Sequence, residues 1–345
     1  MKKKKYKKAL VIGSGAFGTS VANILAHNFE NIILMGRSKN IADDINGCRE
    51  NKCYLPGQKL EKNIKAVLSW KDVHMEEGEI DLLVFGLPST AITGYIFENF
   101  KNVEKILSGN ILAVSLAKGI DPVTLELTDD LYFNFFSDYR DNFTFLSGPS
   151  FAKEIVDKQV TLVSLAGRSK KVLMAIADMM QTPYFKVLPN YDVKGVLLGG
   201  ALKNILAIAG GILEGLGFNY NTRAAMITRG IAEITSFGKV MNARPETFYG
   251  LSGMGDLILS TTGDLSRNKN FGLEIAKGRK PEEILGEVGY VVEGYKTTLA
   301  AYRMSKKYEI KARIFNAVYQ VLYEDEKPMD IIKYLMKIPA RFEID

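Results

Sequence analysis

The sequence predicts an α/β protein with two domains, the first a mostly parallel sheet with helices and the second all-helical. At 345 residues the chain exceeds the roughly 250–300 at which a single hydrophobic core stops growing. Short β-branched or aromatic runs alternate with helical patterns through the first half, which is typical of a parallel sheet. After Pro189 the pattern becomes almost wholly helical. We therefore expect domains at residues 1–189 and 190–345.

Two sets of segments are expected to form these domains. The strands are expected at residues 7–12, 31–35, 81–85, 111–115, 143–147, 160–166 and 184–188. The helices of the second domain are expected at residues 191–216, 222–241, 268–278, 281–285, 294–307, 311–323 and 328–336.

The charge of the chain comes from one short segment. Residues 1–8 contain six lysines, and removing those six from 45 Lys and Arg leaves 39, which balances 39 Asp and Glu. The body of the protein therefore shows no basic excess of the kind that a nucleic-acid partner requires.

The chain is expected to be cytoplasmic. Residues 9–12 are apolar but run directly into glycines, so no secretory signal follows the lysines. The longest apolar stretch, residues 195–213, is interrupted by Lys203 and Asn204, which favours a buried helix over a membrane span. With only Cys48 and Cys53, a disulfide framework is not expected and a reducing compartment fits better.

A glycine-rich turn follows the first expected strand. Residues 13–18 (GSGAFG) fit the pattern G-x-G-x-x-G between a strand and a helical run from Thr19 to His27. Gly13, Gly15 and Gly18 would allow a tight turn that aims the helix N-terminus at a pyrophosphate, as in a Rossmann-like dinucleotide-binding domain. The alternative is a purely structural turn.

Arg37 follows the second strand at the position where a site selective for NAD usually carries an acidic residue. A guanidinium there can pair with the 2′-phosphate of NADP or lie over the adenine. The alternative is a solvated arginine in a loop.

The catalytic acid or base is expected among lysines and carboxylates. The chain has only His27 and His74, one in the first helix and one in a polar connection, and both are expected to be structural or exposed. Zinc-binding patterns and the phosphate-binding loop G-x-x-x-x-G-K-[ST] are absent from the sequence, so no metal is expected. Hydride chemistry at a carbonyl still needs a group that donates and accepts a proton.

Lys203 is the first candidate for that role. It lies in an apolar helical segment beside Gly199 and Gly200, and such small residues allow a ligand to come close. A buried lysine without a partner would be costly, so Lys203 either extends to solvent or has a function.

Two further segments carry polar groups at expected helix starts. Asp256 follows two glycines and is either part of a site or a helix cap. Residues 266–268 (SRN) offer a hydroxyl, a cation, an amide and free backbone N–H groups, which suit a phosphate. The alternative for residues 266–268 is a capped, solvated helix start.

A series of segments resembles the motifs of the bacterial-type NAD(P)-dependent sn-glycerol-3-phosphate dehydrogenases, in order along the chain. They are residues 13–19 (GSGAFGT), 116–120 (LAKGI), 147–152 (SGPSFA), 201–204 (ALKN), 221–230 (NTRAAMITRG), 253–257 (GMGDL), 266–268 (SRN) and 292–294 (VEG). The resemblance implies reversible reduction of dihydroxyacetone phosphate to sn-glycerol 3-phosphate for glycerophospholipid synthesis, with NADP or NAD as cofactor. It implies a small-molecule substrate and leaves a homodimer open.

The resemblance also implies roles for residues. Lys203 would be the general acid and base, with its pKa lowered by Lys118 and raised by Asp256. The substrate would be bound by Lys118, Gly148, Ser150, Lys203, Asp256, Ser266, Arg267 and Asn268. The cofactor would be bound by Gly13, Gly15, Ala16, Phe17, Gly18, Arg37, Tyr54, Lys118, Ala152, Arg267, Val291 and Glu293. Phe17 stands where the family commonly has Trp or Tyr, and Ala16 where many members have Ser.

Two rival functions remain open from the residues. A dehydrogenase for a 2-keto or β-hydroxy acid shares the domain plan but would need a carboxylate clamp rather than a phosphate site. A regulator that binds NADP without turnover would have no need of Lys203, Lys118 and Asp256 together.

Overall fold

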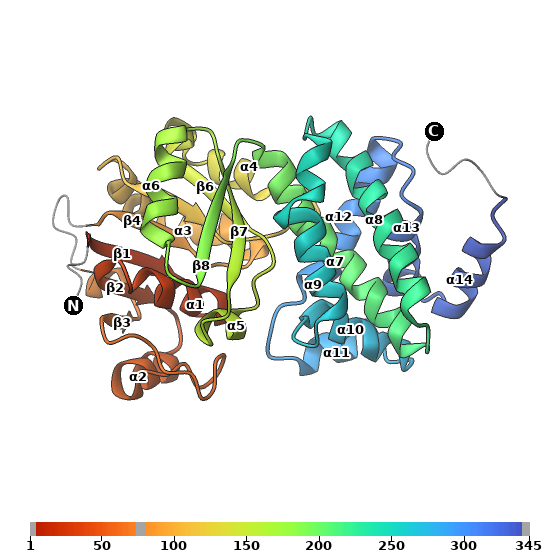
Figure 1. Ribbon diagram of the computed structural model, residues 1–345, viewed down its shortest axis with the longest axis horizontal. Coiled ribbons are helices and arrows are strands. Elements are labelled where there is room, and N and C mark those ends of the chain that lie inside the picture. The colour runs from red at the N-terminus through yellow and green to blue at the C-terminus, as the bar shows by residue number, and fades with distance from the viewer. Residues whose placement is uncertain (1–4, 74–79, 340–345) are drawn as a thin grey trace.

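The computed structural model describes residues 5–73 and 80–339. His74 and the lysines at positions 2–4 lie outside these residues. The two halves of the chain lie side by side, with the sheet in one half and a group of helices in the other (Figure 1).

An eight-stranded sheet forms the centre of the first half. Its strands are β1 (Tyr6–Ile12), β2 (Phe29–Met35), β3 (Ile64–Val67), β4 (Leu82–Phe85), β5 (Leu112–Ser115), β6 (Phe143–Ser147), β7 (Thr161–Gly167) and β8 (Phe185–Asn190). They lie in the order β3-β2-β1-β4-β5-β6-β7-β8, and neighbouring strands are parallel except for β6 and β7. The mostly parallel sheet is confirmed, and β3 is a strand that the sequence pattern did not predict.

Helices cover both faces of this sheet. They are α1 (Ala16–Leu25), α2 (Lys39–Cys48), α3 (Ile92–Leu107), α4 (Thr128–Phe133), α5 (Ala152–Val156) and α6 (Lys170–Met180), with short 3₁₀ turns η1 (Trp70–Asp72), η2 (Ser89–Ala91) and η3 (Ser137–Asn142). Side chains alternate along β1, so that Leu10 and Ile12 join the core beside α3 while Ala9 and Val11 join the core beside α1. This double covering explains why the strand is apolar throughout.

The second half is helical, as predicted. Its elements are α7 (Val193–Gly215), α8 (Tyr220–Val240), η4 (Pro245–Tyr249), the π-helical turn η5 (Leu251–Gly255), α9 (Asp256–Thr262), α10 (Arg267–Ala276), α11 (Pro281–Glu287), α12 (Glu293–Lys307), α13 (Arg313–Tyr323) and α14 (Pro328–Met336). The sequence pattern did not predict η4, η5 or α9. Because β8 ends at Asn190 and α7 begins at Val193, we keep the domain division at residues 189 and 190 as a proposal.

Helix α7 lies at the centre of the helical half, in contact with α8, α9, α10, α12 and α13. It is long and apolar enough to cross a membrane, but 94% of its most apolar window is buried inside the protein. Its glycines let α10 approach backbone to backbone: a Cβ on Gly211 would lie 2.0 Å from the Lys269 carbonyl oxygen, and one on Gly272 would lie 2.2 Å from that of Ile208. Helix α7 is therefore held as the core of the second half.

One residue of the first half lies elsewhere than expected. Helix α1 ends at Leu25, so His27 follows the helix rather than lying within it. Its Nε2 lies 3.0 Å from the Tyr184 hydroxyl, a structural contact that joins two parts of the first half.

Glu233 should make the stability of the second half depend on pH. Its buried carboxylate on α8 accepts hydrogen bonds from the backbone N–H groups of Ile314 and Phe315 at the start of α13, yet burial raises its pKa from 4.5 to about 7. Because the folded protein then binds the proton more tightly than the unfolded chain, we expect the free energy of unfolding to fall by about 3 kcal/mol between pH 4.5 and 7.

Urea unfolding of the wild type and of Glu233→Gln at pH 5 and pH 8 measures this contribution. The Gln variant should lose that part of the pH dependence, and the same change at exposed Glu283 provides the control. Equal pH dependence in the wild type and in Glu233→Gln would contradict the prediction.

Candidate active site

The glycine-rich turn between β1 and α1 has the shape that a pyrophosphate needs. Gly13 has φ of +112°, and a Cβ there would lie 2.4 Å from the Gly86 carbonyl oxygen. A Cβ on Gly18 would lie 2.0 Å from the carbonyl oxygen of Gly13, whereas one on Gly15 would meet nothing within 4 Å. The first and third glycines thus close the turn, and the second keeps the backbone open to a ligand. The N–H groups of the first helical turn, which have no partner within the helix, can bind such an anion.

The other residues expected at the cofactor are spread over several elements. Ala16 and Phe17 form the first turn of α1, and Ala152 starts α5, which packs against α1. Arg37 is exposed directly after β2, and Tyr54 is half-buried in the connection after α2. The structure brings Phe17 close to the substrate residues, because its ring centre lies 5.9 Å from the Nζ of Lys118.

Three charged residues meet where the two halves join. Lys203 projects from α7, Asp256 begins α9, and Lys118 follows β5. The carboxylate of Asp256 lies between the two lysines, with Oδ1 3.0 Å from Lys203 Nζ and Oδ2 2.7 Å from Lys118 Nζ. Each partner is separated from the others by at least 50 positions in the chain, so this cluster exists only in the fold.

Burial and charge together set the ionisation of the cluster. Burial lowers the pKa of Lys203; the Asp256 carboxylate raises it, and the Lys118 ammonium lowers it further, so the net direction is downward. Burial opposes ionisation of Asp256, but the two ammonium groups outweigh it and hold the pKa of this carboxyl below its usual value. A lysine that is paired with a carboxylate yet has a lowered pKa can both give up and regain a proton.

Ser260 is a member of this cluster that the sequence analysis missed. Its hydroxyl oxygen accepts a hydrogen bond of 2.6 Å from Lys203 Nζ and itself donates to Asp256 Oδ1 at 3.2 Å. The available signal was its spacing four residues after Asp256, which places both on one face of a helix. We did not predict α9, and without that helix the spacing carried no meaning.

Gly148 and Ser150 lie beside Lys118. The Gly148 carbonyl oxygen accepts hydrogen bonds from Lys118 Nζ at 3.2 Å and from the Ser150 hydroxyl at 2.9 Å. Gly148 has φ of +146°, and a Cβ there would lie 3.0 Å from Cα of Val163. A side chain at position 148 would therefore strain the pairing of β6 with β7. It would also disturb the Gly148 carbonyl oxygen, to which Lys118 donates.

Two of the residues expected to bind the phosphate lie at the start of α10. Ser266 is the N-cap of this helix, and its hydroxyl oxygen accepts a hydrogen bond from the N–H of Lys269. Arg267 is exposed, and its guanidinium lies 4.9 Å from the ring centre of Tyr290.

Asn268 is buried, and both ends of its amide have protein partners. Its Nδ2 donates to Asn204 Oδ1 at 3.0 Å, and its Oδ1 accepts from the Gly294 N–H at 2.9 Å. Asn268 therefore joins α7, α10 and α12, with one amide hydrogen left for a ligand.

Glu293 connects the two halves of the chain at the start of α12. Its carboxylate accepts from the Ser89 hydroxyl at 2.7 Å and from the Ser89 N–H at 3.3 Å, and burial raises its pKa. Val291, two residues earlier, is 44% exposed. The structure thus gives Glu293 a protein partner that the sequence did not indicate.

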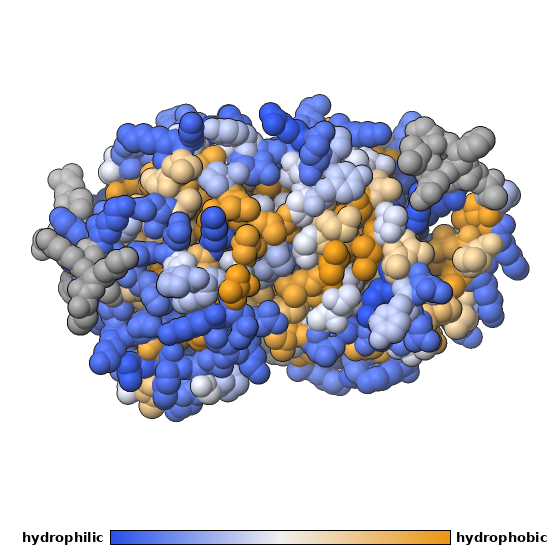
Figure 2. Space-filling view, in the orientation of Figure 1, coloured by the Kyte–Doolittle hydropathy of each residue, from blue (hydrophilic) through white to orange (hydrophobic). Residues whose placement is uncertain are grey.

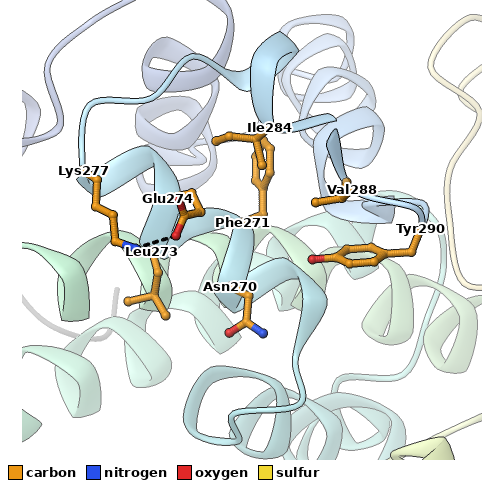
Figure 3. Close-up of a pocket in the computed structure, with 8 residues that line it drawn as sticks. All are labelled: Asn270, Phe271, Leu273, Glu274, Lys277, Ile284, Val288 and Tyr290. Atoms are coloured by element: carbon orange, nitrogen blue, oxygen red, sulfur yellow. Dashed lines mark hydrogen bonds and ion pairs between the residues drawn. The ribbon is translucent and has the colours of Figure 1, made fainter. Parts of the chain in front are cut away.

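A hollow of about 500 Å³ lies apart from this cluster, between α10 and α11 (Figure 3). Phe271, Ile284 and Val288 give it an apolar lining, and Glu274 at its rim is paired with Lys277. Tyr290 reaches across it from the loop before α12. The hollow contains neither lysine of the site, so it is not where the reaction is expected.

No group of three or more His, Cys, Asp and Glu side chains is placed to hold a metal ion among residues 5–73 and 80–339.

Comparison with known proteins shows similarity along nearly the whole chain. Family models described as the N-terminus and the C-terminus of NAD-dependent glycerol-3-phosphate dehydrogenase match residues 8–173 and 192–333. The chain is 39% identical over 329 residues to glycerol-3-phosphate dehydrogenase [NAD(P)+] of Solidesulfovibrio magneticus, covering 95% of this chain and 98% of that protein. It is 38% identical over 338 residues to the enzyme of the same name from Carboxydothermus hydrogenoformans, covering 98% of each.

Solved structures agree with these relatives. The crystal structure of glycerol-3-phosphate dehydrogenase from Coxiella burnetii superposes with a TM-score of 0.86 at 28% identity, covering 96% of this chain and 99% of that one. The glycerol-3-phosphate dehydrogenase of Plasmodium falciparum gives 0.84 at 25% identity, covering 98% and 97%. With both family models matched in order and the charged cluster formed where the two halves meet, the chain belongs to the NAD-dependent glycerol-3-phosphate dehydrogenase family.

Proposed function

We propose that this protein is an NAD(P)-dependent glycerol-3-phosphate dehydrogenase that reversibly reduces dihydroxyacetone phosphate to sn-glycerol 3-phosphate for glycerophospholipid synthesis. The observation that carries the proposal is the cluster of Lys203, Asp256 and Lys118 at the junction of the two halves. Family membership supports it from an independent direction.

Lys203 acts as the general acid and base. When bound, the nicotinamide supplies or accepts the hydride. As the ammonium, Lys203 donates a proton to the developing alkoxide at C2 of the substrate, and as the neutral amine it takes the proton back in the other direction. Lys118 adds a second positive charge beside the reacting oxygen, while Asp256 and Ser260 hold Lys203 in place.

The remaining residues bind the two ligands. Gly148 and Ser150 complete the substrate site beside Lys118, and Ser266, Arg267 and Asn268 bind the phosphate. The cofactor contacts Gly13, Gly15, Ala16, Phe17, Gly18, Arg37, Tyr54, Lys118, Ala152, Arg267, Val291 and Glu293. The open space beside Gly15 supports the assignment of the glycine-rich turn to the pyrophosphate. The position of Phe17 near Lys118 supports the placement of the cofactor beside the substrate.

A single assay tests the function. Absorbance at 340 nm should fall when dihydroxyacetone phosphate is added with NADPH or NADH. Turnover of a non-phosphorylated keto acid in its place would favour the rival dehydrogenase class, and NADP binding without any turnover would favour a regulator.

Arg37 is expected to set the choice of cofactor. Its exposed guanidinium directly after β2 is available to a 2′-phosphate, so NADPH should be used at least as well as NADH. Arg37→Asp should raise the KM for NADPH much more than the KM for NADH, because a carboxylate repels the phosphate. Steady-state kinetics with both cofactors measure this, and an equal rise in both KM values would show that Arg37 does not bind the 2′-phosphate.

The protein is proposed to be cytoplasmic and to form a homodimer. Figure 2 shows apolar residues near the middle of one face, and Leu162, Leu188 and Tyr191 on or next to β7 and β8 are 37%, 38% and 55% exposed. A second copy would cover such a surface. Light scattering of the purified protein gives the mass, and a monomer at micromolar concentration would contradict the dimer.

A further inference from the structure

Asn51 has a buried amide whose hydrogen-bonding groups are all used. It lies in the connection between α2 and β3 and is 0% exposed. Its Nδ2 donates to the Ser14 carbonyl oxygen and to Thr19 Oγ1, both at 2.9 Å, and its Oδ1 accepts the N–H of Tyr54 at 3.2 Å. The side chain thus ties the connection that carries Tyr54 to the glycine-rich turn.

The hydrogen bond to Ser14 fixes the direction of one peptide group. In a trans peptide the carbonyl oxygen and the next N–H point in opposite directions. With the Ser14 oxygen held by Asn51, the N–H of Gly15 points away from Asn51. No hydrogen bond within the described part of the chain uses this N–H, and a Cβ on Gly15 would meet nothing within 4 Å on its side.

Two further contacts hold the same peptide. The Thr19 hydroxyl donates to the Ser14 oxygen at 3.3 Å, so this oxygen has two donors. A Cβ on Gly36 would lie 2.1 Å from Ser14 Oγ, which shows that the Ser14 side chain packs directly on the end of β2. Asn51 supplies the shorter of the two hydrogen bonds, and it connects the peptide to the segment after α2, outside the β1–α1–β2 unit.

We propose that Asn51 is a positioning residue for the cofactor: by holding the Ser14 carbonyl oxygen it directs the Gly15 N–H and the first turn of α1 toward the pyrophosphate. This inference rests on the proposed function. Asn51 itself touches neither ligand, because it is 0% exposed and protein groups take both of its amide hydrogens. The cofactor then binds more tightly, because the N–H groups that receive its pyrophosphate are already oriented before it arrives.

Replacing Asn51 should weaken binding of ligands that contain a pyrophosphate. Asn51→Leu keeps the size of the side chain but removes both donors, so the Ser14 carbonyl oxygen keeps only its longer hydrogen bond, the one from the Thr19 hydroxyl. One hydrogen bond to a charged group corresponds to roughly a 10- to 100-fold change in affinity. We expect the Kd values for NADPH and for ADP-ribose to rise by that factor, measured by NADPH fluorescence and by competition with it.

A matched control lies in the same part of the chain. Asn63 also donates through Nδ2 to two carbonyl oxygens, those of Ala26 and Phe29, but at the opposite end of β2 from the turn. Asn63→Leu should leave the Kd for NADPH within about threefold of the wild type. Should Asn51→Leu not fold, Asn51→Ala removes both donors without adding bulk or charge, and it carries the same expectation.

Three measurements separate the possible results. Adenosine 2′-phosphate, which lacks the pyrophosphate, should bind wild type and Asn51→Leu equally, whereas equal weakening of this ligand would show that Asn51 acts through Tyr54 and would overturn the proposal. At saturating NADPH, kcat should recover while the KM for NADPH stays raised; a lowered kcat with unchanged KM would overturn it too. If the wild type bound neither NADPH nor NADH, the proposed function would be contradicted instead.

Discussion

Lys203→Met should lower kcat by about 100-fold or more, the usual contribution of a general acid or base. The methionine keeps much of the lysine's length, and the fold should survive because the buried charge and its desolvation are removed together. The Asp256 carboxylate keeps Lys118 as its partner at 2.7 Å. Steady-state kinetics in both directions, together with the Kd for NADPH, measure the effect.

Lys194→Met provides the control for this variant. Lys194 lies on the same helix and is also ion-paired, to Asp129 and Asp130, but it has no contact with the Lys203 cluster. Its kcat should stay within about threefold of the wild type, because Lys194 is not placed to exchange a proton with the substrate and both of its carboxylate partners lie outside the Lys203 cluster. A near-normal kcat for Lys203→Met would remove Lys203 from the chemistry and leave Lys118 as the remaining cation.

Glycerol should be a poorer substrate than glycerol 3-phosphate by roughly two to four decades in kcat/KM. Hydrogen bonds to charged groups contribute about 1.5–3 kcal/mol each, so losing a phosphate held by two of them costs about 3–6 kcal/mol. At about 1.4 kcal/mol per decade this gives the expected ratio. A ratio near one would show that residues 266–268 do not bind a phosphate.

Arg267 is the residue at which to test this preference. Arg267→Ala should reduce the ratio of kcat/KM between the two substrates, and because Arg267 is exposed its loss leaves no buried group unpaired. Asn268→Ala is unsuited to the purpose. It would leave the Gly294 N–H and the Asn204 side chain without partners, so an effect on activity would not distinguish phosphate binding from the packing of α7, α10 and α12.

Periodic and local features were predicted from the sequence because their causes lie within short segments. The apolar runs of β1 and β2 and the glycine turn after β1 depend on neighbouring residues, and the structure shows them as expected. β3 was missed because the exposed Lys65 interrupts its apolar run, whereas β4 is equally short but apolar and buried throughout. The segment of η5 and α9 was missed because its glycines, normally breakers of helices, here form a π-helical turn.

The partners of the site residues could not be predicted in the same way. Asn51 carries no local signal, since it acts through groups on other elements that only the fold brings near. The spacing of Ser260 from Asp256 had a meaning only once α9 was known. Glu293 was expected at the cofactor, but its hydrogen bonds to Ser89 join segments 204 positions apart. The resemblance to the family identified which residues belong to the site. The structure adds the contacts of these residues, and those contacts make their roles testable.

The backbone contact of α7 with α10 limits how the length of this region can change during evolution. Gly211 and Gly272 fix the register of the two helices, since neither position has room for a Cβ. Lys203 lies on α7 eight residues before Gly211. One residue inserted between them would turn Lys203 by about 100° and shift it by about 1.5 Å, away from Asp256. Insertions and deletions should therefore be tolerated in the loop between α7 and α8 but not between positions 203 and 211.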